Sequence, residues 1–317
     1  MDLNDDGQKD ILIGSFSGIP QWIEGTKDGY GKSTDVLDGD GAPVIISEFW
    51  DVEEDDWNES DKTGTTGHCS SVAAVDWDDD GDMDLLLGGY RNGGLFLRLN
   101  EGSSTQTKFA TKNETIKVGD KPISFDGGMG APRVGDWDGD GLFDIVVGTI
   151  RGEVVLFRNA GSKGKPAFPE MTTLVKALPG PSGSKQIKRV AAAKDGEGPV
   201  GPGSSYHIEL VDYDADGDLD LLVGGRSEWL TGPEKVPTEE ELELAAKLKE
   251  ESSAAYSEFA KRKKEAAKKG EDEGDKYRAS DEAKALLKTY RDKRVEAIKI
   301  TADPKETGDF VWLYRRN

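Results

Sequence analysis

Four nine-residue stretches of the chain space their oxygen-bearing side chains in the same way. The stretch DWDDDGDMD, from Asp76 to Asp84, has aspartates at its positions 1, 3 and 5, glycine at position 6 and aspartate at position 9. The same pattern recurs at residues 2–10, 136–144 and 212–220, with Asn4 as the single replacement among these aspartates. We number these stretches loops 1 to 4 in chain order. Ca²⁺ takes six to eight oxygen ligands at about 2.3–2.6 Å, so this spacing of oxygens predicts calcium binding.

The predicted ligands are the side chains at positions 1, 3, 5 and 9 and the main-chain carbonyl at position 7. They are Asp2, Asn4, Asp6, Gln8 and Asp10 in loop 1; Asp76, Asp78, Asp80, Asp82 and Asp84 in loop 2; Asp136, Asp138, Asp140, Leu142 and Asp144 in loop 3; and Asp212, Asp214, Asp216, Asp218 and Asp220 in loop 4. Without a cation such clustered carboxylates repel one another. A turn rich in Asp and Gly that binds no metal is the alternative, because both residues favour turns. Four copies in one register favour about four bound Ca²⁺ ions, with weaker binding in loop 1 because Asn4 is uncharged.

The loops differ from an EF-hand, which needs a bidentate glutamate at position 12 and flanking helices. Position 12 is apolar in all four loops, and the flanking segments are short β-branched runs. The loops are therefore expected to connect β-strands.

A longer unit repeats around the loops. Loop starts are 74, 60 and 76 residues apart, and GGLFLRLNEGS (93–103) matches GEVVLFRNAGS (152–162). One unit reads as strand, acidic loop, strand, tight turn, strand and outer strand. Four-stranded units repeated radially form a β-propeller. The aromatic residues at position 2, Trp77, Trp137 and Tyr213, are expected to pack between neighbouring blades.

The motif DWDGDGLFDIVVG and its siblings resemble the FG-GAP/VCBS repeat family, which includes the calcium-binding blades of integrin α-chains and many secreted bacterial proteins. The resemblance covers the chain except residues 163–205 and 233–304. It implies an all-β propeller with calcium ligands at positions 1, 3, 5 and 9 of each loop. The sequence has no strand before loop 1 and no outer strand after the last unit, so we expect blades of a partial ring spanning residues 1–317.

Residues 237–300 interrupt the last unit. They are rich in Ala, Glu, Lys and Leu, and Thr238 with Glu241 forms a capping-box signature. A second helix is expected from Ser280, with Leu287, Tyr290, Val295 and Ile298 on one face, before DFVWLYRRN resumes the blade. The prediction is an inserted α-helical hairpin, either a solvated decoration or a docking surface for a partner. No stretch approaches the ~18 apolar residues of a membrane helix, so no membrane insertion is expected.

Composition restricts the partners. The chain has 62 acidic and 41 basic residues, a formal net charge of −21, and four Ca²⁺ ions would leave −13. This balance argues against nucleic-acid binding, which needs a basic face. Cys69 is the only cysteine, and no signal peptide is visible. Loops of this kind suit Kd values of about 10⁻⁴–10⁻³ M, typical of extracellular modules, so an extracellular, cell-surface or periplasmic location is expected.

Two functions follow from these features. The first is a non-catalytic binding or adhesion module in which Ca²⁺ is structural. Its ligand, a glycan or another surface protein, would meet Arg91, Arg151 and Arg226 near the turns between second and third strands, although exposed arginines are often merely solvated. The alternative is a polysaccharide lyase or hydrolase, or its accessory propeller domain. His68 and His207, each near the start of a first strand, are the candidates for that chemistry, but no nucleophile–base pair is assigned by spacing.

Overall fold

The computed structural model describes residues 1–51, 56–59, 67–90, 93–125, 128–177, 203–230, 236–270, 273–302 and 305–316. The chain divides into two compact units. The β unit holds the described residues up to Trp229 and those from Thr307 onward, and the helical unit spans Leu230–Glu306. Each unit is described by itself below.

Two complete blades form the middle of the β unit. Each is a four-stranded antiparallel sheet whose strands pair in chain order. The strands are β6 (Cys69–Val75), β7 (Asp84–Gly89), β8 (Leu95–Arg98) and β9 (Glu114–Thr115) in one blade, and β12 (Gly130–Gly135), β13 (Asp144–Thr149), β14 (Val154–Phe157) and β15 (Thr172–Val175) in the next. Loops 2 and 3 join the first strand to the second in their blades, as predicted.

The outer sheets have three strands each. The first contains β1 (Ile11–Ile13), β2 (Gln21–Thr26) and β3 (Gly29–Asp35); the last contains β16 (Ser204–Val211), β17 (Asp220–Leu230) and β18 (Lys305–Tyr314). Two small hairpins, β4 (Glu48–Asp51) with β5 (Asp56–Glu59) and β10 (Lys117–Val118) with β11 (Lys121–Pro122), lie between blades in the chain. The predicted fold class, an all-β propeller of four-stranded blades with an inserted helical hairpin, is confirmed in its antiparallel blade sheets and its hairpin.

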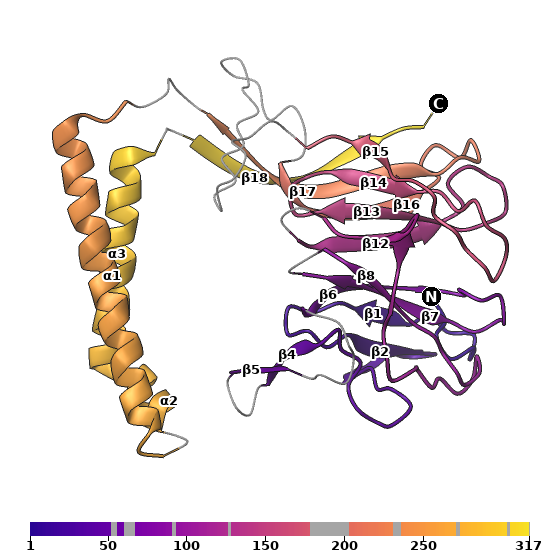
Figure 1. Ribbon diagram of the computed structural model, residues 1–317, viewed down its shortest axis with the longest axis horizontal. Coiled ribbons are helices and arrows are strands. Elements are labelled where there is room, and N and C mark those ends of the chain that lie inside the picture. The colour runs from indigo at the N-terminus through magenta and orange to yellow at the C-terminus, as the bar shows by residue number, and fades with distance from the viewer. Residues whose placement is uncertain are drawn as a thin grey trace. The chain divides into compact units, whose positions relative to one another are not determined.

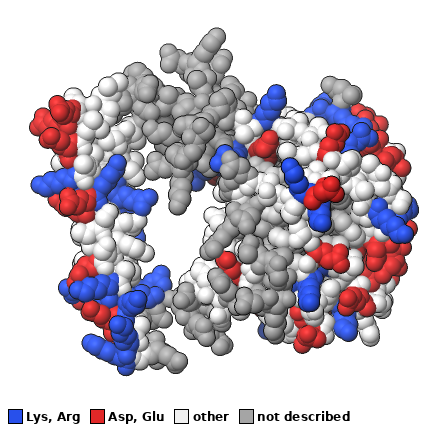
Figure 2. Space-filling view, in the orientation of Figure 1, with Lys and Arg blue, Asp and Glu red and all other residues white. Residues whose placement is uncertain are grey.

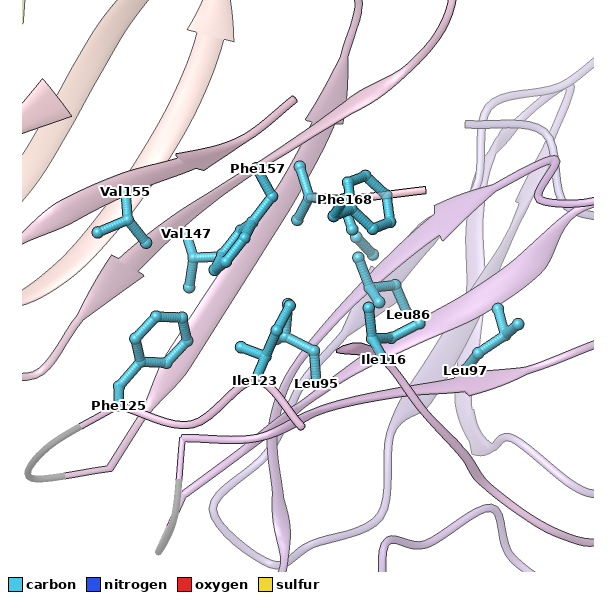
Figure 3. Close-up of a cluster of buried hydrophobic side chains, with 12 residues drawn as sticks. Leu86, Leu95, Leu97, Ile116, Ile123, Phe125, Val147, Val155, Phe157 and Phe168 are labelled. Carbon is cyan, nitrogen blue, oxygen red and sulfur yellow. The ribbon is translucent and has the colours of Figure 1, made fainter. Parts of the chain in front are cut away.

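The sheets follow one another in chain order as successive layers (Figure 1). The first strands of the four sheets, β1, β6, β12 and β16, each contact the next. The described residues form no closed ring. Apolar side chains from adjacent blades fill the space between layers, as shown in Figure 3 for Leu86 and Leu95 of one blade and Val147 and Phe157 of the next.

The aromatic residue at loop position 2 contributes to this packing in two loops. The Trp77 ring lies 5.4 Å from Phe143 and 6.0 Å from Phe168, both in the following blade. Trp137 packs against the cluster that includes Ile208. Tyr213 differs, because its side chain is 57% exposed. The expected packing is thus confirmed for the two tryptophans and wrong for Tyr213.

The helical unit contains α1 (Glu239–Ala267), α2 (Glu273–Ala279) and α3 (Asp281–Thr301). The predicted capping box is present, with the Thr238 hydroxyl accepting from the Glu241 N–H and the Glu241 carboxylate accepting from the Thr238 N–H. Basic and acidic side chains are interspersed along this unit (Figure 2). None of its described helices is long and apolar enough to span a bilayer.

The apolar face predicted for the second helix is partly wrong. Val295 and Ile298 are 45% and 46% exposed, and the buried residues of α3 are Ala283 and Ala297. Ala297 packs against Ala245 and Leu248 of α1. The α3 side of this seam is centred on a small residue, Ala297, which a count of large apolar side chains does not detect.

Candidate metal-binding loops

The four loops share one backbone conformation. The carboxylate at position 1 accepts hydrogen bonds from the N–H groups of positions 5 and 6, at 3.1 and 3.2 Å for Asp76. Asp2, Asp136 and Asp212 make the same pair of bonds. The carboxylate at position 5 accepts from the N–H of position 7 in every loop, at 2.8 to 3.0 Å. A common local geometry therefore accompanies the repeated spacing.

Two positions of each loop have left-handed backbone. Position 6 is always glycine, with φ between 83° and 97°. Position 4 also has positive φ, and it is occupied by Asp5 (54°), Asp79 (63°), Gly139 (76°) and Ala215 (60°). Glycine, aspartate and asparagine adopt this region most easily. The strained Ala215 could not be recognised from sequence, because alanine carries no turn signal.

The aspartate at position 9 is buried and joins two parts of its blade. Asp84 is 0% exposed; its Oδ2 accepts from the Trp77 N–H at 2.8 Å and its Oδ1 from the Asn100 N–H at 2.6 Å. Asp10, Asp144 and Asp220 make the equivalent bonds. The donors to Oδ1 lie just beyond the third strand of the blade in loops 2 to 4, so the carboxylate ties the loop to that strand end.

Two buried asparagines extend this connection. Asn100 and Asn159 are 4% exposed, and each donates its own N–H to the aspartate at position 9. Each side-chain Oδ1 accepts two further backbone N–H groups from the following turn, at 2.7 to 3.1 Å. Sequence reasoning gave them no role, although the matching segments RLNEGS and FRNAGS contained the signal.

Carboxylate oxygens converge in three of the loops. One oxygen from each of three side chains lies within 4.8 Å of the others in loops 2, 3 and 4. The sets are Asp76, Asp78 and Asp84; Asp136, Asp138 and Asp144; and Asp212, Asp214 and Asp216. Loop 1 supplies the amide of Asn4 at position 3.

Several acceptors in these loops are buried without a hydrogen-bond donor. Within the described part of the chain, Asn4 Oδ1, Asp82 Oδ1 and Asp138 Oδ1 have no hydrogen-bond partner. Asp82 is only 3% exposed. A buried acceptor normally has a donor, and a cation satisfies the same requirement. The donor set therefore fits a hard divalent cation.

Electrostatic strain is largest in loop 2. Burial raises the pKa of Asp84 to about 7, against two backbone hydrogen bonds that lower it. Burial, together with the charges of Asp80, Asp78 and Asp76, raises the pKa of Asp82 to about 6. In loop 3 burial also raises the pKa of Asp144. A positive ion among these carboxylates would reverse these shifts, because opposite charge favours the ionised form.

The two described arginines that were predicted to contact a ligand lie in different kinds of secondary structure. Arg151 is in the turn between β13 and β14 and is partly exposed. Arg226 is exposed but lies within β17, opposite Ser204, so its expected position in a turn is wrong. Arg91 lies outside the described residues.

The two histidines lie in different environments. His68 is 3% exposed, its Nδ1 is 3.9 Å from Glu48 Oε2, and its ring lies 4.8 Å from Tyr90 and 4.5 Å from Trp57. His207 is exposed on β16. Strand β12 contacts both β6, which follows His68, and β16, which carries His207.

Comparison with known families agrees with the repeated loop. Residues 76–147, which contain loop 2, the strands β7 to β9 that follow it and loop 3, match the model of the FG-GAP-like repeat. No curated protein matches the sequence. The matched segment supports an FG-GAP-like repeat over these residues, and loops 1 and 4 in the neighbouring sheets have the same hydrogen-bonded geometry.

Proposed function

We propose that this chain is a calcium-binding repeat module in which Ca²⁺ ions in the loops stabilise the blades. The observation that carries the proposal is the convergence of three carboxylates, within 4.8 Å, in each of loops 2 to 4. Bound Ca²⁺ would supply positive charge to oxygens that otherwise repel one another. The aspartate at position 9 of each loop also accepts a hydrogen bond from a backbone N–H outside the loop. Neutralising the charge of the loop would therefore stabilise the blade as well as the loop.

The test is a calorimetric Ca²⁺ titration of protein stripped with a chelator, paired with melting curves. We expect about four ions, or three if Asn4 weakens loop 1, and a clear rise in melting temperature. A ligand that binds only the folded state stabilises it by about 2.7 kcal/mol at 100-fold excess over Kd. A protein that binds no Ca²⁺ and melts at the same temperature with and without it would refute the proposal. Mg²⁺ is the control, because it prefers rigid octahedral sites and keeps its waters.

We further propose a non-catalytic binding role, outside cells or at the cell surface. The support is the repeat family, the closed loops and an acidic chain, with millimolar extracellular Ca²⁺ matching loops of this type. An anionic glycan or a surface protein would meet the face that carries Arg151. Binding to a glycan array that is unchanged by Arg151→Ala would remove this arginine from the proposal.

A further inference from the structure

The side chain that faces position 3 differs from loop to loop. In each blade, one residue donates its N–H to Oδ1 of the aspartate at position 9. In three of the four blades, the residue just before this donor contacts the side chain at position 3 of the loop. We call that preceding residue the flanking residue. The flanking residues are Glu24, Leu99, Arg158 and Arg315 for loops 1 to 4.

Three flanking residues contact position 3 directly. Arg158 Nη2 forms an ion pair with Asp138 Oδ2 in loop 3. In loop 4, Arg315 Nη1 lies 3.5 Å from Asp214 Oδ2. In loop 1 the relation is reversed, because Asn4 Nδ2 donates to Glu24 Oε1 at 3.1 Å.

Loop 2 has an apolar flanking residue instead. Leu99 packs against the apolar cluster between blades and carries no charge to offset Asp78. A lysine does approach this loop, but Lys163 Nζ is 4.0 Å from Asp79 Oδ1, and both side chains are more than half exposed. Exposed pairs of this kind contribute little.

The same contrast appears at position 7. Arg316 Nη2 lies 3.7 Å from Asp218 Oδ1 in loop 4. The residue equivalent to Arg316 in loop 2 is the neutral Asn100, and the position-7 side chain there, Asp82, is buried with Oδ1 lacking a hydrogen-bond partner.

The loops therefore differ in formal charge. Loop 2 has six aspartates, and neither its flanking residue nor the N–H donor that follows it is an arginine, so its formal charge is −6. Loop 3 has four aspartates and one arginine, and loop 4 has five aspartates and two arginines, so both sum to −3. A guanidinium that already pairs with a ligand carboxylate competes with a metal ion for that oxygen.

We propose that the flanking residue sets how strongly each loop depends on Ca²⁺. Leu99 leaves loop 2 uncompensated, so loop 2 is the tightest site and the one whose blade needs the ion. Arg158 and Arg315 partly neutralise loops 3 and 4 from within the chain, which weakens Ca²⁺ binding there and keeps these loops folded without it. This inference rests on the calcium-binding function proposed above.

The experiment exchanges the flanking residues. Ca²⁺ titrations of the whole chain are compared for wild type, Arg158→Leu, Leu99→Arg and Leu99→Gln. Arg158→Leu should tighten one of the weaker sites by roughly tenfold and lower the melting temperature in chelator, and Leu99→Arg should weaken the tightest site by a similar factor. Leu99→Gln, the matched uncharged control, removes the same packing and should keep the affinity of that site.

The outcomes separate this inference from the function on which it rests. A wild-type protein that binds no Ca²⁺ overturns the proposed function. Wild-type binding with site affinities unchanged in Arg158→Leu and Leu99→Arg overturns the inference alone. If Leu99→Arg does not fold, Arg158→Leu and Arg315→Leu decide, because both arginine side chains are more than half exposed.

Discussion

The buried aspartates of loop 2 give the calcium-free protein an unusual response to acid. Asp82 and Asp84 have folded-state pKa values of about 6 and about 7, against 3.8 for an ordinary aspartate. At pH values between the unfolded and the folded pKa, these carboxyls keep their protons in the folded state and have lost them in the unfolded chain. The stability contributed by the protonated carboxyls is therefore present below about pH 4 and is lost as pH rises through 6 to 7.

We predict that in chelator the free energy of unfolding falls as pH rises from 4 to 7, and that saturating Ca²⁺ removes or reverses this slope. Asp82→Asn removes one of the titrating groups, so it should flatten the slope, stabilise the calcium-free protein and weaken Ca²⁺ binding. Urea denaturation at several pH values measures this. A stability in chelator that rises steadily from pH 4 to 7 would contradict the prediction.

Sequence spacing predicted which residues line the loops, because the ligand positions lie within nine residues of one another. It could not predict that Arg158 pairs with Asp138 or that Asn100 donates to Asp84. These contacts join residues 15 to 20 positions apart through the pairing of the second and third strands. They depend on strand register, which short motifs do not contain.

At the level of elements, glycine lets the second strand of one blade approach the first strand of the next. A Cβ placed on Gly88 of β7 would lie 1.9 Å from the Gly130 carbonyl oxygen on β12. Gly224, at the equivalent place in β17, would meet only the His207 carbonyl oxygen at 3.5 Å. Two blades therefore approach each other closely at Gly88, whereas the only neighbour of Gly224 belongs to its own sheet.

We predict that Gly88→Ala lowers stability by about 1–3 kcal/mol or more, because overpacking against backbone cannot be relieved by a side-chain rotation. Gly224→Ala is the matched control and should change stability far less. Chemical denaturation of both variants in saturating Ca²⁺ measures the difference. Equal losses for the two variants would show that this approach between blades does not limit their packing.

The strands and the two long helices could be predicted because apolar runs and a capping box mark them locally. The face of α3 could not, because alanines at Ala283 and Ala297 are buried while larger side chains are exposed. The short elements α2, β4, β5, β10 and β11 were also missed, since segments of two to seven residues carry little periodicity.

At the level of the whole molecule, the two units differ in composition. Residues 230–306 contain 18 basic and 19 acidic residues, so almost all of the net charge of −21 belongs to the rest of the chain. All seven tryptophans lie outside residues 230–306, whereas the long helices lie inside them. Fluorescence and circular dichroism therefore report on different units.

We predict that chelation lowers the melting temperature followed by tryptophan fluorescence and leaves the helical signal at 222 nm nearly unchanged. The reason is that every acidic loop belongs to the β unit. Parallel melts with and without Ca²⁺ test this. Identical shifts in both signals would show that the two units unfold as one cooperative body.

Cys69 offers a second probe of the β unit. Its thiol is fully buried on β6, and burial raises its pKa to about 12. Only an exposed thiolate reacts readily, so labelling requires opening of the blade. We predict slow labelling in Ca²⁺ and faster labelling after chelation; equally fast labelling in both conditions would contradict a stabilising role for the ion.

The insertion of the helical unit has a consequence for the order of folding. β18 must pair with β17 across 74 intervening residues, and closing so long a segment costs conformational entropy that grows with its length. Helices form within about a microsecond, and the contact between Ala245 and Ala297 brings the two ends of the insertion together early. The early pairing of the two helices thereby shortens the loop that must close before β18 can pair with β17. The last sheet is then completed after local helix formation, without closing a loop of 74 unfolded residues.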